Sequence, residues 1–169
     1  MTFNDSMLTS IEQIHANCKV LKDRKGLDIV FIDYLQLMRT TEKTGNREQE
    51  ISTISRKAKM MAVDLQVPVI LMSQLNRGVE TRADKKPVLS DLRESGAIEQ
   101  DADIVLFIYR DVVYNEATPN PEICELIVSK HREGETGMLK FISNESLTRF
   151  TDEGEQPNID LMSPENRPF

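Results

Sequence analysis

Short apolar runs separated by a long amphipathic segment constrain the fold of this chain most strongly. The runs at residues 29–32, 67–72 and 103–109 have the length and branched composition of strands. Between the first two, residues 48–66 place apolar side chains on one helical face, at Ile51, Ile54, Ala58, Met61, Ala62 and Leu65. Strands that alternate with helices form parallel sheets. The sequence therefore predicts an α/β fold, with its early strands buried on both faces of a parallel sheet.

The flanking parts of the chain complete this prediction. Residues 7–24 have helical apolar spacing, which predicts a further amphipathic helix. Residues 123–129 and 138–142 predict two strands joined by a glycine-containing turn, as an antiparallel hairpin at a sheet edge, and 147–150 a further short strand. We expect one partial domain over 1–150 and a disordered acidic tail over 151–169.

Two polar connections break the pattern. Residues 39–47 contain Gly45 and Asn46 and predict a mobile loop. Residues 76–96 are long and rich in charge, and such loops are usually functional or disordered.

Charge and cysteine content set limits on location and partners. The net charge is −7, of which the last 19 residues carry −4, so the first 150 residues carry only −3. This charge neither supports nor excludes nucleic-acid binding. Cys18 and Cys124 lie in apolar stretches, which favours buried free thiols in a reducing compartment. The start lacks a signal-peptide pattern, and no apolar run reaches the roughly 20 residues of a membrane helix. We expect a cytoplasmic protein of a bacterium or an infecting phage.

A carboxylate follows the first apolar run. Ile29–Ile32 is followed directly by Asp33, which is the Walker B pattern. A buried strand holds such a carboxylate rigidly at the sheet edge, where Mg²⁺ and phosphates bind in nucleotide-binding α/β folds. Many parallel strands also end in Asp for structural reasons, and the pattern alone leaves this alternative open.

Four ordered blocks sharpen the interpretation: Asp33–Met38 (DYLQLM), 46–77, 90–111 and 129–137. Together they resemble the DnaB family of replicative helicases over roughly residues 4–150. The resemblance implies a RecA-like motor fold of the P-loop NTPase type, with a mostly parallel sheet flanked by helices. It also implies ATP and Mg²⁺ as cofactors, with Asp33 holding the metal through water. Another RecA-like ATPase, such as a recombinase relative, is the alternative, and the DYLQLM and LRESGAIEQDAD blocks argue against it.

The resemblance also assigns roles in sensing nucleotide and binding DNA. Gln74 matches the residue that senses the γ-phosphate; the alternative is an amide that caps a strand end. Arg93, Glu94 and Gly96 match positions that contact the backbone of single-stranded DNA, and here the alternative is a solvated charged loop.

The last block matches the family's finger. Lys130 and Arg132 would complete the ATP site of a neighbouring subunit, where a cation offsets charge during phosphoryl transfer. His131, Glu133 and Glu135 stand where the family more often has neutral residues, and we expect the two acids to weaken the positive field of the finger. The alternative is an exposed, charged hairpin tip.

The phosphate-binding loop is absent from this sequence. None of its glycines fits G-x-x-x-x-G-K-[ST], whose backbone N–H groups and Lys hold phosphates. In the family this loop, the catalytic glutamate and the primase-binding domain precede the part that this chain resembles. We therefore expect an incomplete fold and a chain that is inactive alone; a non-enzymatic module that docks on an intact helicase ring is the alternative.

Partners follow from the same resemblance. It implies single-stranded DNA, further copies in a hexameric ring, a primase and a helicase loader, and no membrane. Without the central strand that leads into the phosphate-binding loop, the remaining strands would expose apolar edges. We therefore expect association with another chain, and a dilute monodisperse monomer by light scattering would contradict this.

Overall fold

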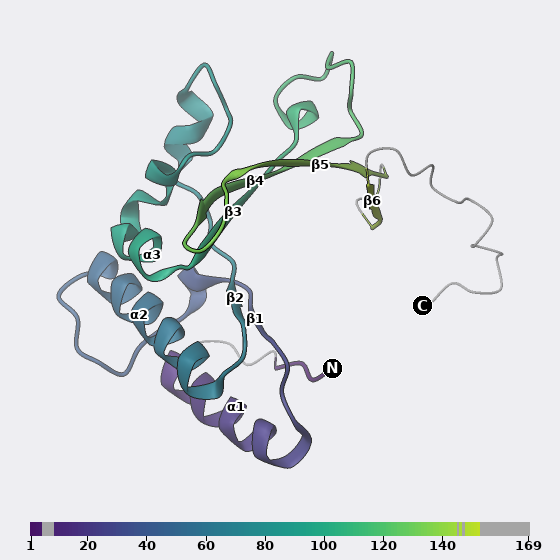
Figure 1. Ribbon diagram of the computed structural model, residues 1–169. Coiled ribbons are helices and arrows are strands. Elements are labelled where there is room, and N and C mark those ends of the chain that lie inside the picture. Colours follow the sequence, from purple (N-terminus) through teal and green to yellow (C-terminus); the bar gives the residue numbers. More distant parts are fainter. Residues whose placement is uncertain (5–8, 145, 147, 153–169) are drawn as a thin grey trace. The chain divides into compact units, whose positions relative to one another are not determined.

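The computed structural model describes residues 1–4, 9–144, 146 and 148–152, in two compact units that divide between Val105 and Leu106. The helices and strands occur in the order shown in Figure 1. They are α1 (Ile11–Lys25), β1 (Val30–Ile32), α2 (Arg47–Leu65), β2 (Val69–Leu71), α3 (Gly96–Asp101), β3 (Ile104–Tyr109), β4 (Ile123–His131), β5 (Gly137–Ser143) and β6 (Phe150–Asp152). Short 3₁₀ helices occupy Leu35–Leu37, Arg77–Thr81, Leu89–Ser95 and Asp111–Val113.

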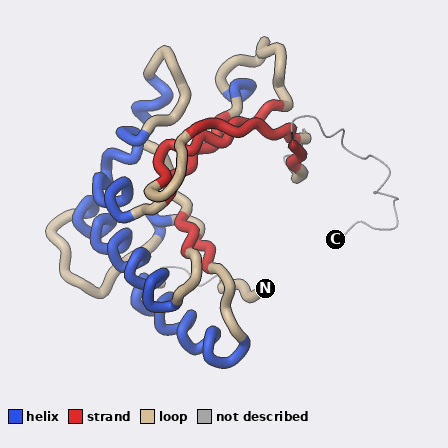
Figure 2. The backbone as a smooth tube through the Cα atoms, viewed as in Figure 1, coloured by secondary structure: helices blue, strands red, loops and turns tan. Residues whose placement is uncertain are grey.

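The two long helices of the first unit begin at side-chain caps. Ser10 Oγ accepts a hydrogen bond from the Gln13 N–H at 3.2 Å, so α1 starts later than residue 7, and residues 5–8 lie outside the described part. Asn46 Oδ1 accepts from the Gln49 N–H at 2.8 Å at the start of α2. Figure 2 shows both helices as long coils beside the first strands. The helical spacing was correct for α2, whose buried face is Ile51, Ile54, Ser55, Ala58, Met61 and Leu65.

β1 and β2 form a parallel pair, with Val30 opposite Val69 and Ile32 opposite Leu71. Val30 and Ile32 belong to the core that α1 and α2 cover. Phe31 and its neighbour Ile70 are 56% and 42% exposed. The prediction that these strands are buried on both faces is therefore wrong for this chain, because the helices of this unit cover only one face. It is also wrong for the third predicted strand, β3, since every second side chain of that strand is exposed.

The later strands form a separate four-stranded sheet in the order β3-β4-β5-β6. β4 and β5 pair antiparallel, with Ile123 opposite Ile142, which confirms the predicted hairpin. Its predicted place at a sheet edge is wrong, because the hairpin lies between β3 and β6. β6 pairs antiparallel with β5, so ordered structure continues to Asp152. The α/β class is confirmed, with one parallel sheet and one antiparallel sheet in place of a single mixed sheet. The predicted tail lies outside the described residues from 153 onward.

Both connections that looked irregular in sequence have defined contacts. In 39–47, the Thr40 hydroxyl and the Thr41 N–H donate to the Glu12 carboxylate. Residues 76–96 contain two 3₁₀ helices and bury Val79, Asp91 and Leu92. Of the helices in the described ranges, none has both the length and the apolar character to cross a membrane.

Candidate functional site

The carboxyl ends of β1 and β2 bring two of the predicted residues to one edge. Asp33 follows β1 directly, and Gln74 lies three residues beyond Leu71, the last residue of β2. The ladder continues past both strands, since the Met72 N–H donates to the Ile32 carbonyl at 3.0 Å and the Leu35 N–H to the Met72 carbonyl at 2.9 Å. Asp33 and Gln74 are both exposed.

A side chain from the DYLQLM block links these two strand ends. The Gln36 Nε2 donates to Ser73 Oγ at 3.0 Å and to the Gln74 carbonyl at 3.3 Å. The Gln36 Oε1 accepts from the Gln74 N–H at 3.1 Å. Leu35 and Met38 on either side are buried in the core. The block is thus both a core element and a polar link to the end of β2.

Arg47, at the start of α2, holds this turn from the other side. Its guanidinium donates to the Gln36 carbonyl at 2.8 Å and to the Met38 carbonyl at 3.2 Å. It also forms an ion pair with Glu50, and Glu50 forms a second ion pair with Arg39 at 3.4 Å. Burial raises the pKa of Glu50, but the hydrogen bond and charge of Arg47 outweigh it and the net pKa is lowered. The turn after Asp33 is therefore tied to α2.

The segment after Gln74 folds around a buried carboxylate. Asp91 accepts a bidentate pair from Arg82 at 2.7 and 3.0 Å, and its side chain is 8% exposed. Asp91 also accepts from the Val88 N–H at 2.8 Å, and its carbonyl accepts from the Asn76 N–H at 2.9 Å. The residues just after Gln74 are thus joined to the residues just before Arg93.

The predicted DNA-contacting residues follow this segment. Arg93 and Glu94 lie in the 3₁₀ helix Leu89–Ser95, and their side chains fall outside what the structure describes. Gly96 begins α3 with φ −50° and ψ −23°, is exposed, and has open space where a Cβ would be. An ordinary residue could adopt this conformation, so the fold itself does not require glycine here.

The predicted finger residues belong to the second unit. Lys130 is the penultimate residue of β4, and Arg132 begins the turn that leads to β5. A Cβ on Gly134 would collide with the His131 ring, so this turn packs a histidine directly against glycine backbone. A larger residue at position 134 would require the His131 side chain to move.

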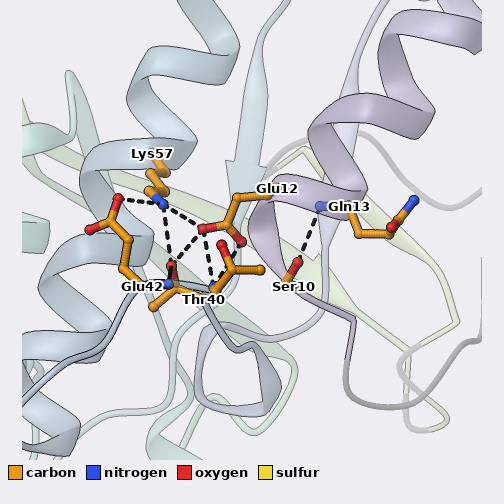
Figure 3. Close-up of polar contacts among 7 residues, drawn as sticks. Ser10, Glu12, Gln13, Thr40, Glu42 and Lys57 are labelled. Atoms are coloured by element: carbon orange, nitrogen blue, oxygen red, sulfur yellow. Dashed lines mark hydrogen bonds and ion pairs between the residues drawn. The ribbon is translucent and has the colours of Figure 1, made fainter.

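A polar cluster beside the site, drawn in Figure 3, anchors the segment that follows the DYLQLM block. Glu12 of α1 accepts from Thr40 at 2.6 Å and pairs with Lys57 of α2, which also pairs with Glu42 at 2.7 Å. Burial raises the pKa of Glu12, but the hydrogen bonds from Lys57 and Thr40 outweigh it and lower the pKa to about 2. For Lys57, burial lowers the pKa, and the bonds to Glu12 and Glu42 reverse this to a net rise.

This cluster predicts an acid-dependent stability. Since the folded pKa of Glu12 lies below the ordinary 4.5, its contribution is complete above pH 4.5 and is lost as pH falls toward 2. Glu12 is 30% exposed, so solvent screening reduces that contribution to about 1–3 kcal/mol. Glu12→Gln should lower the free energy of unfolding at pH 7 by this amount and flatten its slope below pH 4.5, measured by urea denaturation. The exposed Glu48→Gln is the control; equal slopes for the two variants would contradict the prediction.

Several residues of this site were not found from sequence. Gln36 was visible within DYLQLM, yet its amide contacts join it to Gln74, which lies 38 residues later in sequence. Arg47, Arg82 and Asp91 look like ordinary surface charges until the fold brings their partners close. For these three residues, no sequence signal other than their position within the resembling blocks could have indicated the contacts.

The fold and the polar strand ends define a class: an α/β domain of the RecA-like ATPase type. A model of the DnaB-like helicase C terminal domain matches residues 1–152, and the chain belongs to this family. It is 50% identical over 149 residues to the replicative DNA helicase DnaB of Leifsonia xyli subsp. xyli, covering 88% of this chain and 33% of that protein. It is 48% identical over 157 residues to the replicative DNA helicase DnaC of Bacillus subtilis, covering 87% and 34%.

Solved structures give the same result. One solved ATPase domain superposes with a TM-score of 0.81 at 43% identity, covering 86% of this chain and 52% of that one. A DnaB-like replicative helicase, studied for its interactions with primase, superposes with a TM-score of 0.84 at 42% identity, covering 89% and 37%. The chain thus spans about a third of the length of the curated relatives it matches.

Proposed function

We propose that this chain forms part of the motor of a replicative DNA helicase, which couples ATP hydrolysis to movement along single-stranded DNA as a hexameric ring. The observation that carries the proposal is the shared edge of β1 and β2. There Asp33 and Gln74 follow adjacent parallel strands, and Gln36 bonds to the backbone of Gln74. Parallel α/β sheets bind nucleotides at the carboxyl ends of their strands.

The residues at this edge fit Mg²⁺ better than they fit phosphate. Asp33 offers an exposed carboxylate, and Mg²⁺ commonly binds one or two carboxylates plus water and nucleotide oxygens. Gln74 offers an uncharged amide that could register the presence of a phosphate. Bound Mg²⁺ would offset negative charge on the reacting phosphate. This sequence has no phosphate-binding loop, so the cradle for the nucleotide must come from another part of the enzyme.

The neighbouring subunit and the DNA would meet other parts of the chain. Lys130 and Arg132 would extend from the β4–β5 turn to the ATP site of an adjacent copy. Arg93, Glu94 and Gly96 would contact the DNA backbone, which suits a motor that moves over any sequence. A primase and a helicase loader are further proposed partners, and the cytoplasm is the proposed compartment. For the primase, the similar helicase studied with one supplies the support.

A substitution at Gly96 can test the proposed DNA contact without disturbing the fold. Gly96→Ala should leave folding intact and raise stability by up to about 1 kcal/mol, since Ala favours helix and nothing fills its Cβ position. It should weaken single-stranded DNA binding roughly tenfold, the equivalent of one lost close backbone contact. The measurements are thermal unfolding and fluorescence anisotropy with labelled oligo-dT. They require a hybrid helicase in which this chain replaces the matching segment of the Bacillus subtilis relative. Unchanged affinity in a folded variant would remove Gly96 from the DNA site.

A second candidate is a non-enzymatic module that docks on an intact helicase ring. The exposed apolar face at Phe31 and Ile70 favours association with another chain. Both candidates predict negligible ATP hydrolysis by the pure chain. Robust hydrolysis that Asp33→Ala abolishes would show that the chain is a complete ATPase by itself and would overturn both. Activity of the hybrid helicase supports the motor; co-purification with an intact ring, together with an inactive hybrid, supports the docking module.

A further inference from the structure

The side-chain amide of Gln36 bonds to the backbone of Gln74 both as a hydrogen-bond donor and as an acceptor. Its Oε1 accepts from the Gln74 N–H at 3.1 Å, and its Nε2 donates to the Gln74 carbonyl at 3.3 Å. The same Nε2 donates to Ser73 Oγ at 3.0 Å. One side chain thus satisfies both polar backbone groups of Gln74. A primary amide is suited to this because it carries a donor and an acceptor on one carbon.

The other end of Gln36 is equally fixed. Leu35 is fully buried and Met38 is 4% exposed, so the turn that carries Gln36 is fastened to the core. The Gln36 carbonyl accepts from Arg47 at 2.8 Å, which ties the same turn to the first residue of α2. Asp33 lies only three residues before Gln36. The link therefore sets the position of the Gln74 backbone relative to the strand end that bears the carboxylate.

We propose that Gln36 is the positioning residue for Gln74, fixing the Gln74 backbone relative to the strand end that bears Asp33. The functional meaning rests on the proposed role of Gln74 as phosphate sensor. A sensor that reports a small displacement must have a backbone held in one place, since a loose backbone would absorb the movement. Gln36 acts through Gln74 and has no proposed contact with nucleotide.

Solvent exchange of backbone amides, followed by NMR on the whole chain without nucleotide or DNA, tests the link. Gln36→Met keeps the length of the side chain but removes both hydrogen-bonding groups, and should speed exchange of the Gln74 N–H by about threefold to tenfold. Gln36→Glu keeps an acceptor for that N–H and should restore exchange to within about twofold of the parent. The Met72 N–H, bonded to the Ile32 carbonyl, should be unchanged in both variants.

Gln49→Met is the matched control, because the Gln49 Oε1 also accepts from a backbone N–H, that of Gly45 at 2.9 Å. It should speed exchange at Gly45 and leave Gln74 unchanged. Two outcomes would overturn the proposal: no change at Gln74 in Gln36→Met, or an equal rise at Gln74 and Met72, which would make Gln36 only a general stabiliser. Since no nucleotide is present, the test stands even if the hybrid helicase proves inactive, so the two proposals fail separately.

Discussion

Replacing Arg132 by alanine in the hybrid helicase is expected to lower kcat for ATP hydrolysis by about 10³-fold or more, with little change in the amount of folded ring. An arginine supplied to a phosphoryl-transfer site contributes ~10³–10⁵ in rate because its charge is present where negative charge develops. Glu133 and Glu135 flank this turn and would reduce the local positive potential, which places the expected loss at the lower end of that range. Steady-state hydrolysis in the presence of DNA measures it.

The control variants distinguish the loss of the Arg132 charge from a distortion of the turn between β4 and β5. Arg132→Lys keeps a cation but loses the planar fork, and should recover part of the lost rate. Gly134→Ala leaves Arg132 intact but forces His131 to move, and should lower kcat less than Arg132→Ala does. If the finger acts on a neighbour, mixing Arg132→Ala subunits with Asp33→Asn subunits restores hydrolysis at interfaces that combine the two intact residues. Unchanged kcat in Arg132→Ala would contradict the assignment.

Asp91→Ala is expected to lower the free energy of unfolding of the chain by about 2–4 kcal/mol. The substitution breaks a buried ion pair and leaves the groups that bonded to the Asp91 carboxylate without an acceptor. Arg82 would lose both of its carboxylate contacts, and the Val88 N–H its acceptor. Asp91→Asn should cost less, because its oxygen can still accept from Val88. Urea denaturation followed by circular dichroism provides the measurement.

A surface pair gives the matched control for this experiment. Lys59 pairs with Asp103, and their side chains are 35% and 50% exposed. Lys59→Met should therefore cost no more than about 1 kcal/mol. If Asp91→Ala cost no more than Lys59→Met, the segment from 76 to 92 would not depend on its buried pair. The backbone hydrogen bond from the Asn76 N–H to the Asp91 carbonyl does not involve the Asp91 side chain and should remain in either case.

The helices and the hairpin were predictable because their signals are local. The buried face of α2 repeats at helical spacing, and Asn46 is a good cap next to it. The exposure of Phe31 was not predictable, because an apolar strand looks the same whether one or both of its faces are covered. The order within 76–96 was also missed, since it depends on Arg82 finding Asp91, and composition does not report such a pair.

The candidate site also has parts that could be predicted from the sequence and parts that could not. Asp33 and Gln74 each follow an apolar run, and strand ends of a parallel pair must share an edge, so their proximity follows from sequence. The hydrogen bonds that link the two strand ends could not be predicted from sequence, because Gln36 bonds to Gln74, a residue 38 positions later. Lys130 and Arg132 come from the resemblance to the family, which the match over residues 1–152 confirms while their roles stay predictions.

ATP hydrolysis by the hybrid helicase, compared with its Asp33→Asn variant, tests the central claim most directly. The claim is that this chain contributes the magnesium carboxylate and the sensor edge of a helicase motor, while the phosphate cradle comes from elsewhere. It predicts DNA-stimulated hydrolysis by the hybrid helicase and negligible hydrolysis by the chain alone. Asp33→Asn should lower kcat of the hybrid helicase by at least about 10²-fold, because the variant loses the metal's contribution to charge stabilisation. An active hybrid that keeps its full rate after Asp33→Asn would contradict it.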